Sequence, residues 1–194
     1  NMQVVDTATN KPTDTDFTAQ ITKLRNAGCD LVALGAIVRD AILAYGTARK
    51  MGWTDVDFVS QSASFDQIVA SAPGGATEGL YVGAGTVMPY RDTADATVAA
   101  WWDAYKAKFG SDPNIGAVYG TNTANLIITA LDKAGKDLTT EKFLKALESI
   151  QGYRDIFGGP VLNFGPDKHL GTNEVLLYQI QKGRFVQIAG PLKY

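Results

Sequence analysis

The sequence is poor in the residues that most often carry chemistry. It contains one cysteine, Cys29, and one histidine, His169, among 194 residues. A lone cysteine cannot form an intrachain disulfide, and a zinc site of the usual kind needs several cysteine or histidine ligands. We therefore expect neither a disulfide framework nor a metal centre, and we interpret Cys29 as a small buried hydrophobic residue.

The charges of the two signs are nearly balanced. Eighteen Lys and Arg face twenty Asp and Glu, for a net charge of -2, so no basic field is available to attract nucleic acid or an acidic membrane surface. The longest apolar runs are far shorter than the roughly 20 residues of a membrane span. The first residues, Asn1–Asp6, lack the pattern of a signal peptide. We expect a soluble protein whose sequence starts on a strand, in the middle of a fold.

Motifs of enzymes and nucleotide-binding proteins are also missing. No serine lies in a Gly-x-Ser-x-Gly pattern, and there is no phosphate-binding loop. Gly83-Ala84-Gly85 lacks the third glycine of a dinucleotide fingerprint. His169 lies in a turn-rich stretch, and Glu141 and Glu148 share a predicted helix with lysines, as solvated carboxylates do. We expect no enzyme activity and no cofactor.

Up to about Met88, short apolar runs alternate with amphipathic helical patterns, as in a parallel sheet covered by helices. The predicted helices run from Thr15 or Asp16 to Gly28, from Asp40 to Met51, and from a capping box at Ser64–Gln67 to about Ala72. The predicted strands are Gln3–Val5, Leu31–Leu34, Val56–Val59 and Leu80–Val82.

After Met88-Pro89 three helical patterns follow one another without strands between them. The first pattern ends at Gly110 and the second ends before Gly135. The third follows Thr139 or Thr140. A strand-like tail carries a hairpin signal at Lys182-Gly183. This change predicts a boundary between residues 1–88 and 89–194, and the alternative is one domain with a helical cap.

Open parallel sheets bind ligands beyond the carboxyl ends of their strands. Three segments fall there, 35–39, 60–65 and 83–88, and the middle one combines hydroxyls and an amide with an aromatic ring. Arg39 is a candidate clamp for a carboxylate or simply faces solvent, and the serines are candidate ligand donors or helix caps. The predicted ligand-binding residues are Ala36, Ile37, Arg39, Gln61, Ser62, Ala63 and Phe65.

The stretch Thr15–Gly35, with Asp16-Phe17-Thr18 at a helix start and a strand ending in glycine, resembles type I periplasmic binding proteins of the leucine/isoleucine/valine class. Further similarity to that family lies in four short segments along nearly the whole chain: Ala48–Gly52, Glu78–Leu80, Gly120–Ala124 and Lys182–Val186.

The resemblance implies an α/β fold of two doubly wound parallel-sheet lobes, joined by three crossovers, with the ligand held between them. It also implies that the amino-terminal part is absent. Residues 1–88 would form most of the second, carboxyl-terminal lobe. Residues 89–194 would cross back to the first lobe, with the tail returning to the second. The implied setting is the periplasm, and the implied partner is the membrane permease of an ABC importer.

In amino-acid-binding members, a tyrosine follows the strand matched by Leu31–Leu34 and an acidic residue follows the strand matched by Val56–Val59. This sequence has Ile37 and Ser62 at those positions. Without an acid, the ammonium group of an amino acid would be buried unpaired, at a cost of several kcal/mol. The hypothesis is therefore a small carboxylic acid without an amino group, with aromatic acids as candidates. A ligand-sensing regulatory domain and an α/β enzyme are the alternatives, and we expect the exposed apolar surface of the fragment to favour a homodimer.

Overall fold

The computed structural model describes residues 2–193. The chain forms two compact units, and it passes between them at Ala84/Gly85, Leu176/Leu177 and Ala189/Gly190. Unit 1 contains the chain up to Ala84 together with Leu177–Ala189, and unit 2 contains Gly85–Leu176 and the residues from Gly190 onward. The first passage lies four residues before the predicted boundary at Met88-Pro89. The fold is α/β with a parallel-rich sheet, as the sequence predicted.

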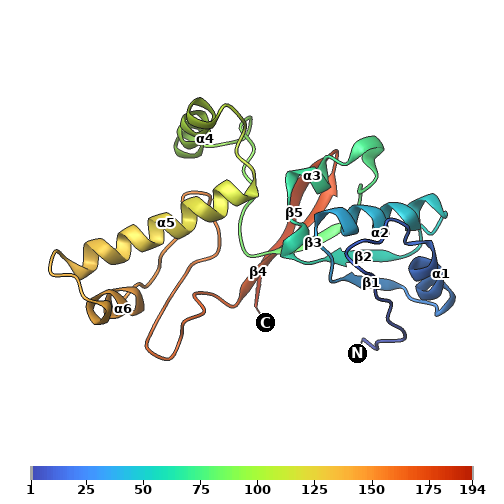
Figure 1. Cartoon of the computed structure of the whole chain (residues 1–194), viewed down its shortest axis with the longest axis horizontal. Helices are drawn as coiled ribbons and strands as arrows, with labels where there is room; N and C mark the ends of the chain where they lie inside the picture. Colours follow the sequence, from blue (N-terminus) through green and yellow to red (C-terminus); the bar gives the residue numbers. More distant parts are fainter. Residues whose placement is uncertain (1, 194) are drawn as a thin grey trace. The chain divides into compact units, whose positions relative to one another are not determined.

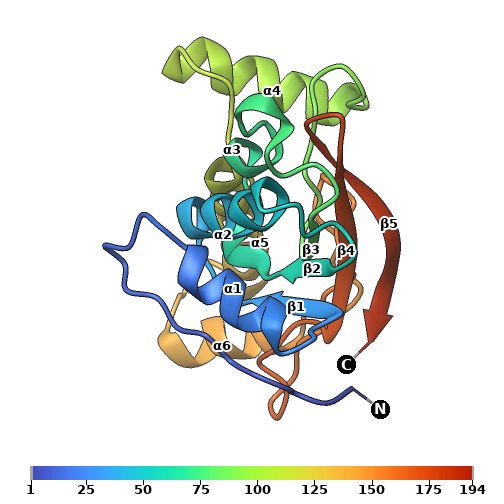
Figure 2. The same cartoon turned by 90° about the vertical axis from the view of Figure 1, so that its right-hand side faces the viewer.

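Unit 1 is built on parallel strands β1 (Leu31–Leu34), β2 (Asp57–Ser60) and β3 (Tyr81–Ala84). The hairpin strands β4 (Glu174–Gln181) and β5 (Arg184–Lys193) extend the sheet in the order β1-β2-β3-β4-β5 (Figure 2). The predicted turn is confirmed, because Lys182 and Gly183 have φ values of 53° and 74°, as two-residue hairpin turns require.

Three helices lie beside this sheet (Figure 1): α1 (Thr18–Asn26), α2 (Val38–Lys50) and the short α3 (Gln67–Ala70). Two 3-10 turns, η1 (Ser62–Ser64) and η2 (Pro73–Gly75), flank α3. Tyr45 of α2 and Trp53 approach the ring of Phe58 on β2 edge-on, with centroids 5.3 and 5.8 Å away. These aromatic contacts fix α2 on the sheet.

Three local predictions for unit 1 are wrong. Residues 3–5 form no strand, and Val4 is 86% exposed, because the extended pattern finds no partner strand there. Ser64 does not cap a helix. The cap of α3 is Asp66, whose carboxylate accepts a hydrogen bond from the Ile68 amide at 2.9 Å. Cys29 is half-buried rather than buried.

Unit 2 contains α4 (Ala96–Phe109), α5 (Ile115–Ala134) and α6 (Thr140–Glu148), close to the predicted helices. Each begins at a residue whose side chain accepts a first-turn amide hydrogen bond, namely Asp95, Asn114 and Thr139. The helix α6 packs beside the carboxyl-terminal half of α5 (Figure 1), around a core of Ala130, Ala146 and Ile150.

Within residues 2–193, no helix combines the length and the apolar character that crossing a membrane requires.

Candidate functional site

A buried hydroxyl pair ties the ends of β1 and β2 together. In the parallel register Leu34 lies opposite Ser60. The Ser60 hydroxyl donates to the Leu34 carbonyl at 3.4 Å, and Ser64 Oγ lies 2.6 Å from Ser60 Oγ and 2.8 Å from the Gln61 carbonyl oxygen. Ser60 and Ser64 are 4% and 0% exposed. The segment after β2 is therefore held beside the segment after β1, where the sequence predicted a binding edge.

The residues above this pair form what we call the carboxyl-end surface: Ala36, Ile37, Gln61, Ser62 and Ala63. Ile37 is 60% exposed, Gln61, Ser62 and Ala63 are exposed, and Ala36 is half-buried. All five are uncharged. The sequence predicted each of them, and the structure brings them to neighbouring strand ends in unit 1.

The start of α2 adds a polar feature to this surface. Its N-cap is Ile37, which has extended backbone angles and a side chain that cannot accept a hydrogen bond. The amides of a helix's first turn have no partner within the helix, and they carry the positive end of the helix dipole. The carboxyl-end surface thus combines an apolar side chain and neutral polar groups with backbone donors suited to an anion.

Phe65 does not belong to this surface. Its side chain is 1% exposed, and its ring lies 4.6 Å from Tyr178 and 4.5 Å from Phe185, measured between ring centroids. The prediction that Phe65 forms an apolar wall for a ligand is wrong, because the β4–β5 hairpin covers the ring. Sequence reasoning could not see this contact, since the hairpin lies more than a hundred residues further along the chain.

The Arg39 side chain is engaged in hydrogen bonds within unit 1. Its guanidinium donates to the Asp40 carboxylate at 2.9 and 2.8 Å, and to the carbonyl oxygens of Pro12 and Asp14 at 2.5 and 3.1 Å. Asn10 donates to the other oxygen of Asp40 at 3.1 Å. Arg39 therefore neither stands free as a carboxylate clamp nor simply faces solvent. It fastens the segment before α1 to the start of α2.

The third predicted segment is divided between the units. Gly83 and Ala84 end β3 in unit 1, and Gly85–Met88 belong to unit 2.

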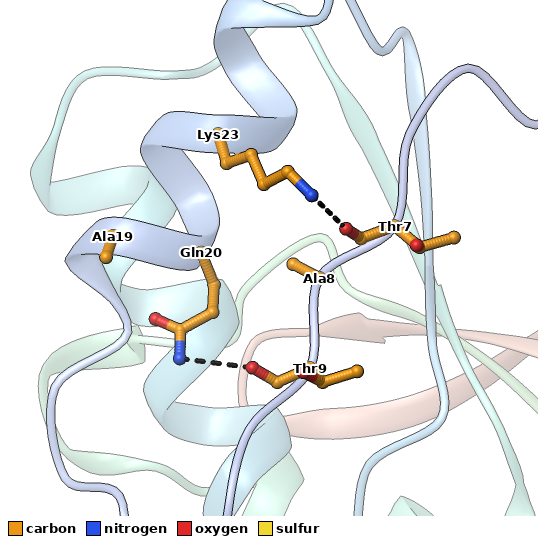
Figure 3. Close-up of a pocket in the computed structure, with 6 residues that line it drawn as sticks. All are labelled: Thr7, Ala8, Thr9, Ala19, Gln20 and Lys23. Carbon is orange, nitrogen blue, oxygen red and sulfur yellow. Dashed lines mark hydrogen bonds between the residues drawn. The ribbon is translucent and has the colours of Figure 1, made fainter.

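An open cavity of about 450 Å³ lies elsewhere in unit 1, between residues 7–9 and α1 (Figure 3). Lys23 donates to the Thr7 carbonyl at 2.7 Å and pairs with Asp6 at 3.0 Å, and Gln20 donates to the Thr9 carbonyl at 3.4 Å. The hydrogen bond from Lys23 lowers the pKa of Asp6. These bonds hold the amino-terminal segment on α1, so we read this cavity as a packing feature. Sequence reasoning did not anticipate it.

The described part of the chain shows no cluster of metal-ligating side chains. Residues 2–193 contain no group of three or more His, Cys, Asp or Glu side chains placed to hold a metal ion. His169 is exposed and lies 3.7 Å from Glu148, near α6.

A sequence profile of the periplasmic binding proteins matches residues 1–184. The chain belongs to this family. A comparison with curated proteins gives no match.

Solved structures share the fold of this periplasmic binding protein. A branched-chain amino acid ABC transporter protein from Thermus thermophilus with bound valine superposes with a TM-score of 0.81 at 17% identity, covering 94% of this chain and 50% of that one. A fatty acid ABC transporter substrate-binding protein from Thermomonospora curvata gives 0.77 at 24% identity, covering 95% and 49%. A solute-binding protein of an ABC transporter from R. palustris in complex with benzoate gives 0.68 at 17%, covering 91% and 47%. The chain thus spans about half the length of these proteins.

Proposed function

We propose that this protein is the extracytoplasmic solute-binding component of an ABC importer. It captures a small organic ligand between two lobes, one of which contributes the carboxyl-end surface, and it passes the ligand to a membrane permease without a covalent step. The family supports the binding role. The arrangement of neutral donors beside the start of α2 supports this surface as the ligand contact.

The ligand that this surface favours is a carboxylic acid without an amino group, with aromatic acids as the first candidates. None of the five residues of the surface is acidic. The nearest carboxylates along the chain, Asp40 and Asp66, are already engaged, by Arg39 and by the amide of Ile68. An ammonium group placed here would lose its hydration without gaining an ion pair. Ile37 instead offers an apolar contact, and Ser62 and Gln61 offer neutral hydrogen bonds.

Isothermal titration of the full-length protein with leucine, glutamate, benzoate and a cinnamate tests this proposal. We expect an aromatic acid to bind at least about tenfold more tightly than leucine, which corresponds to about 1.4 kcal/mol. Tight binding of leucine, with no binding of the acids, would contradict it.

A matched pair of variants locates the contact. Ser62→Glu adds a carboxylate to the surface and should weaken binding of an acid about tenfold or more by like-charge repulsion. Thr54→Glu adds the same charge to an exposed residue ahead of β2, at the opposite ends of the strands, and should leave the affinity unchanged. Equal effects of the two substitutions would show that the carboxyl-end surface does not contact the ligand.

A further inference from the structure

Two buried side chains lie beneath the carboxyl-end surface: Ser60, the last residue of β2, and Ser64, the last residue of η1. They are 4% and 0% exposed, so neither is available for a direct ligand contact. A buried hydroxyl without a hydrogen-bond partner is costly, and alanine would occupy either position without that risk. The serine pair therefore indicates a specific role of the two hydroxyls.

The hydroxyls form a chain that connects the two strand ends. Each hydroxyl has one proton to donate. Ser64 Oγ lies 2.6 Å from Ser60 Oγ, which in turn donates to the Leu34 carbonyl at 3.4 Å. Ser64 Oγ also lies 2.8 Å from the Gln61 carbonyl oxygen. One side chain of η1 is thereby connected to the end of β1, to the end of β2 and to its own turn.

The turn that these hydroxyls support is short and exposed. Gln61, Ser62 and Ala63 face solvent. The side chain of Gln61, the N-cap of η1, makes no capping hydrogen bond. The amides of Ser64 and Phe65 donate to the carbonyls of Gln61 and Ser62, at 3.0 Å each. A single 3-10 turn is a weak structure on its own, because its hydrogen-bond geometry is poorer than that of an α-helix.

Phe65 fixes the other end of this turn. Its ring is buried against Tyr178 and Phe185 of the hairpin. The exposed residues 61–63 therefore bridge two fixed points, the end of β2 and Phe65. The serine hydroxyls hold this bridge from its buried side.

We infer that Ser60 and Ser64 are positioning residues of the ligand site. Their hydroxyls keep residues 61–63 in place beside Ile37 before the ligand arrives, so binding does not have to order the turn. A protein whose binding-competent state is only partly populated binds more weakly by that fraction. This inference rests on the proposed function, because it assigns a role within the same surface.

Titration of the full-length protein with benzoate, together with amide hydrogen exchange of the unliganded protein, tests the inference. We expect Ser64→Ala to weaken benzoate binding about fivefold or more. The amides of residues 64 and 65 should exchange at least about tenfold faster, because the turn opens more often. Ser60→Ala should have the same effects. The double variant should bind no more than about twofold more weakly than either single variant, because the two hydroxyls act as one chain.

Thr77→Val provides the matched control. The Thr77 hydroxyl is fully buried in unit 1 and donates to the Val69 carbonyl at 2.5 Å, but Thr77 lies ahead of β3, at the opposite ends of the strands. Both Thr77→Val and Ser64→Ala remove a buried hydroxyl, so chemical denaturation should show similar losses of unfolding free energy. Thr77→Val should leave the affinity and the exchange of residues 64 and 65 within about twofold of the wild type. If Ser64→Ala does not fold, Ser64→Cys replaces it, because a thiol is a weak donor of similar size.

The outcomes separate a positioning role from a purely structural one. Unchanged benzoate affinity in Ser64→Ala would overturn the inference. Equal losses of affinity in Ser64→Ala and Thr77→Val would also overturn it, because the hydroxyls would then serve stability alone. If the wild-type protein did not bind benzoate, the proposed ligand would be wrong, and the exchange of residues 64 and 65 would still decide the positioning role. Faster exchange in Ser64→Ala alone supports that role, and unchanged exchange overturns it.

Discussion

Phe65 packs against two rings of the hairpin, and its side chain is almost completely buried. Replacing a buried phenylalanine by alanine removes the ring's burial and leaves a cavity. We expect Phe65→Ala to lower the free energy of unfolding by about 3–5 kcal/mol, measured by chemical denaturation. Its neighbour Ile68 is 65% exposed, so Ile68→Ala should change that free energy by less than about 0.5 kcal/mol. If Phe65→Ala left stability intact and weakened ligand binding, Phe65 would be a pocket residue after all.

Arg39 and Asp40 form the second residue-scale feature, a tether for the segment before α1. Asp40 is 6% exposed and would keep only the hydrogen bond from Asn10 if the guanidinium were removed. We expect Arg39→Ala to cost about 1.5 kcal/mol of unfolding free energy, at the lower end for charged hydrogen bonds because Arg39 is itself half-exposed. Amide hydrogen exchange of residues 10–14 should rise at the same time.

Arg25 provides the control for this tether, because its exposed guanidinium donates to one carbonyl, that of Met51, at 3.1 Å. Arg25→Ala should leave the exchange of residues 10–14 unchanged. An Arg39→Ala variant with normal exchange in this segment but reduced affinity for a carboxylic acid would restore Arg39 as a ligand clamp.

At the scale of elements, the helix ends were the most predictable features and the partners of each element the least. The helix α4 stops at Gly110, which has a φ of 72°, a conformation that glycine adopts at low cost. Such signals are local, so sequence alone reveals them. The Ser64 hydroxyl instead joins Ser60, and residues 3–5 lack a neighbouring strand. Both outcomes depend on contacts between elements, which a local pattern does not contain.

The same reasoning explains what was found at the candidate site. The order of strands and helices placed Ile37 and Ser62 at the carboxyl ends of a parallel sheet, because that edge follows from the alternating pattern alone. The contacts of Phe65 with the hairpin and of Arg39 with residues 10–14 join segments that are distant in the sequence. A local sequence pattern could not predict them.

The N-cap of α4 gives the element-scale prediction. The Asp95 carboxylate accepts hydrogen bonds from the amides of Thr97 and Val98 at 2.8 and 2.9 Å. Asp95→Ala should lower the free energy of unfolding by about 1 kcal/mol, and Asp95→Ser should keep most of it because serine also caps helices. Chemical denaturation measures both. Equal losses in the two variants would mean that the cap's hydrogen bonds do not contribute to stability.

At the scale of the whole molecule, the chain passes between the two units three times, and the completeness of unit 1 depends on these passages more than on any single contact. The hairpin strands begin and end in unit 2 and lie in the sheet of unit 1 between Leu177 and Ala189. Phe65 packs against the ring of Phe185 in this hairpin. The carboxylate of Glu78 accepts a hydrogen bond from the Lys182 amide at 2.9 Å. Unit 1 is therefore not complete until the last part of the sequence has joined it, so truncation before Leu177 should leave Phe65 and β3 uncovered.

The response of stability to pH is also a property of the whole molecule, because it sums over all titrating groups. Hydrogen bonds lower the pKa of four carboxyl groups: Asp6 through Lys23, Asp16 through Thr18, Asp103 through Arg91, and Asp112 through Lys106 and Trp102. A carboxyl group whose pKa is lower in the folded state binds protons less readily when folded. Its contribution is therefore present above the pKa of the unfolded chain and is lost as the pH falls through the folded pKa.

Since only one histidine is present, we expect the free energy of unfolding to be nearly constant between about pH 5 and 8 and to fall below about pH 4. Urea denaturation across this range measures it. Asp16, Asp103 and Asp112 are exposed and Asp6 is half-buried. Each contribution is therefore small, and about 1 M salt should reduce the acid-induced loss by screening. Asp103→Asn removes one of the groups and should make the loss shallower. A steep fall of the free energy of unfolding between pH 7 and 5 would contradict this account. It would require a buried titrating group other than these four carboxylates.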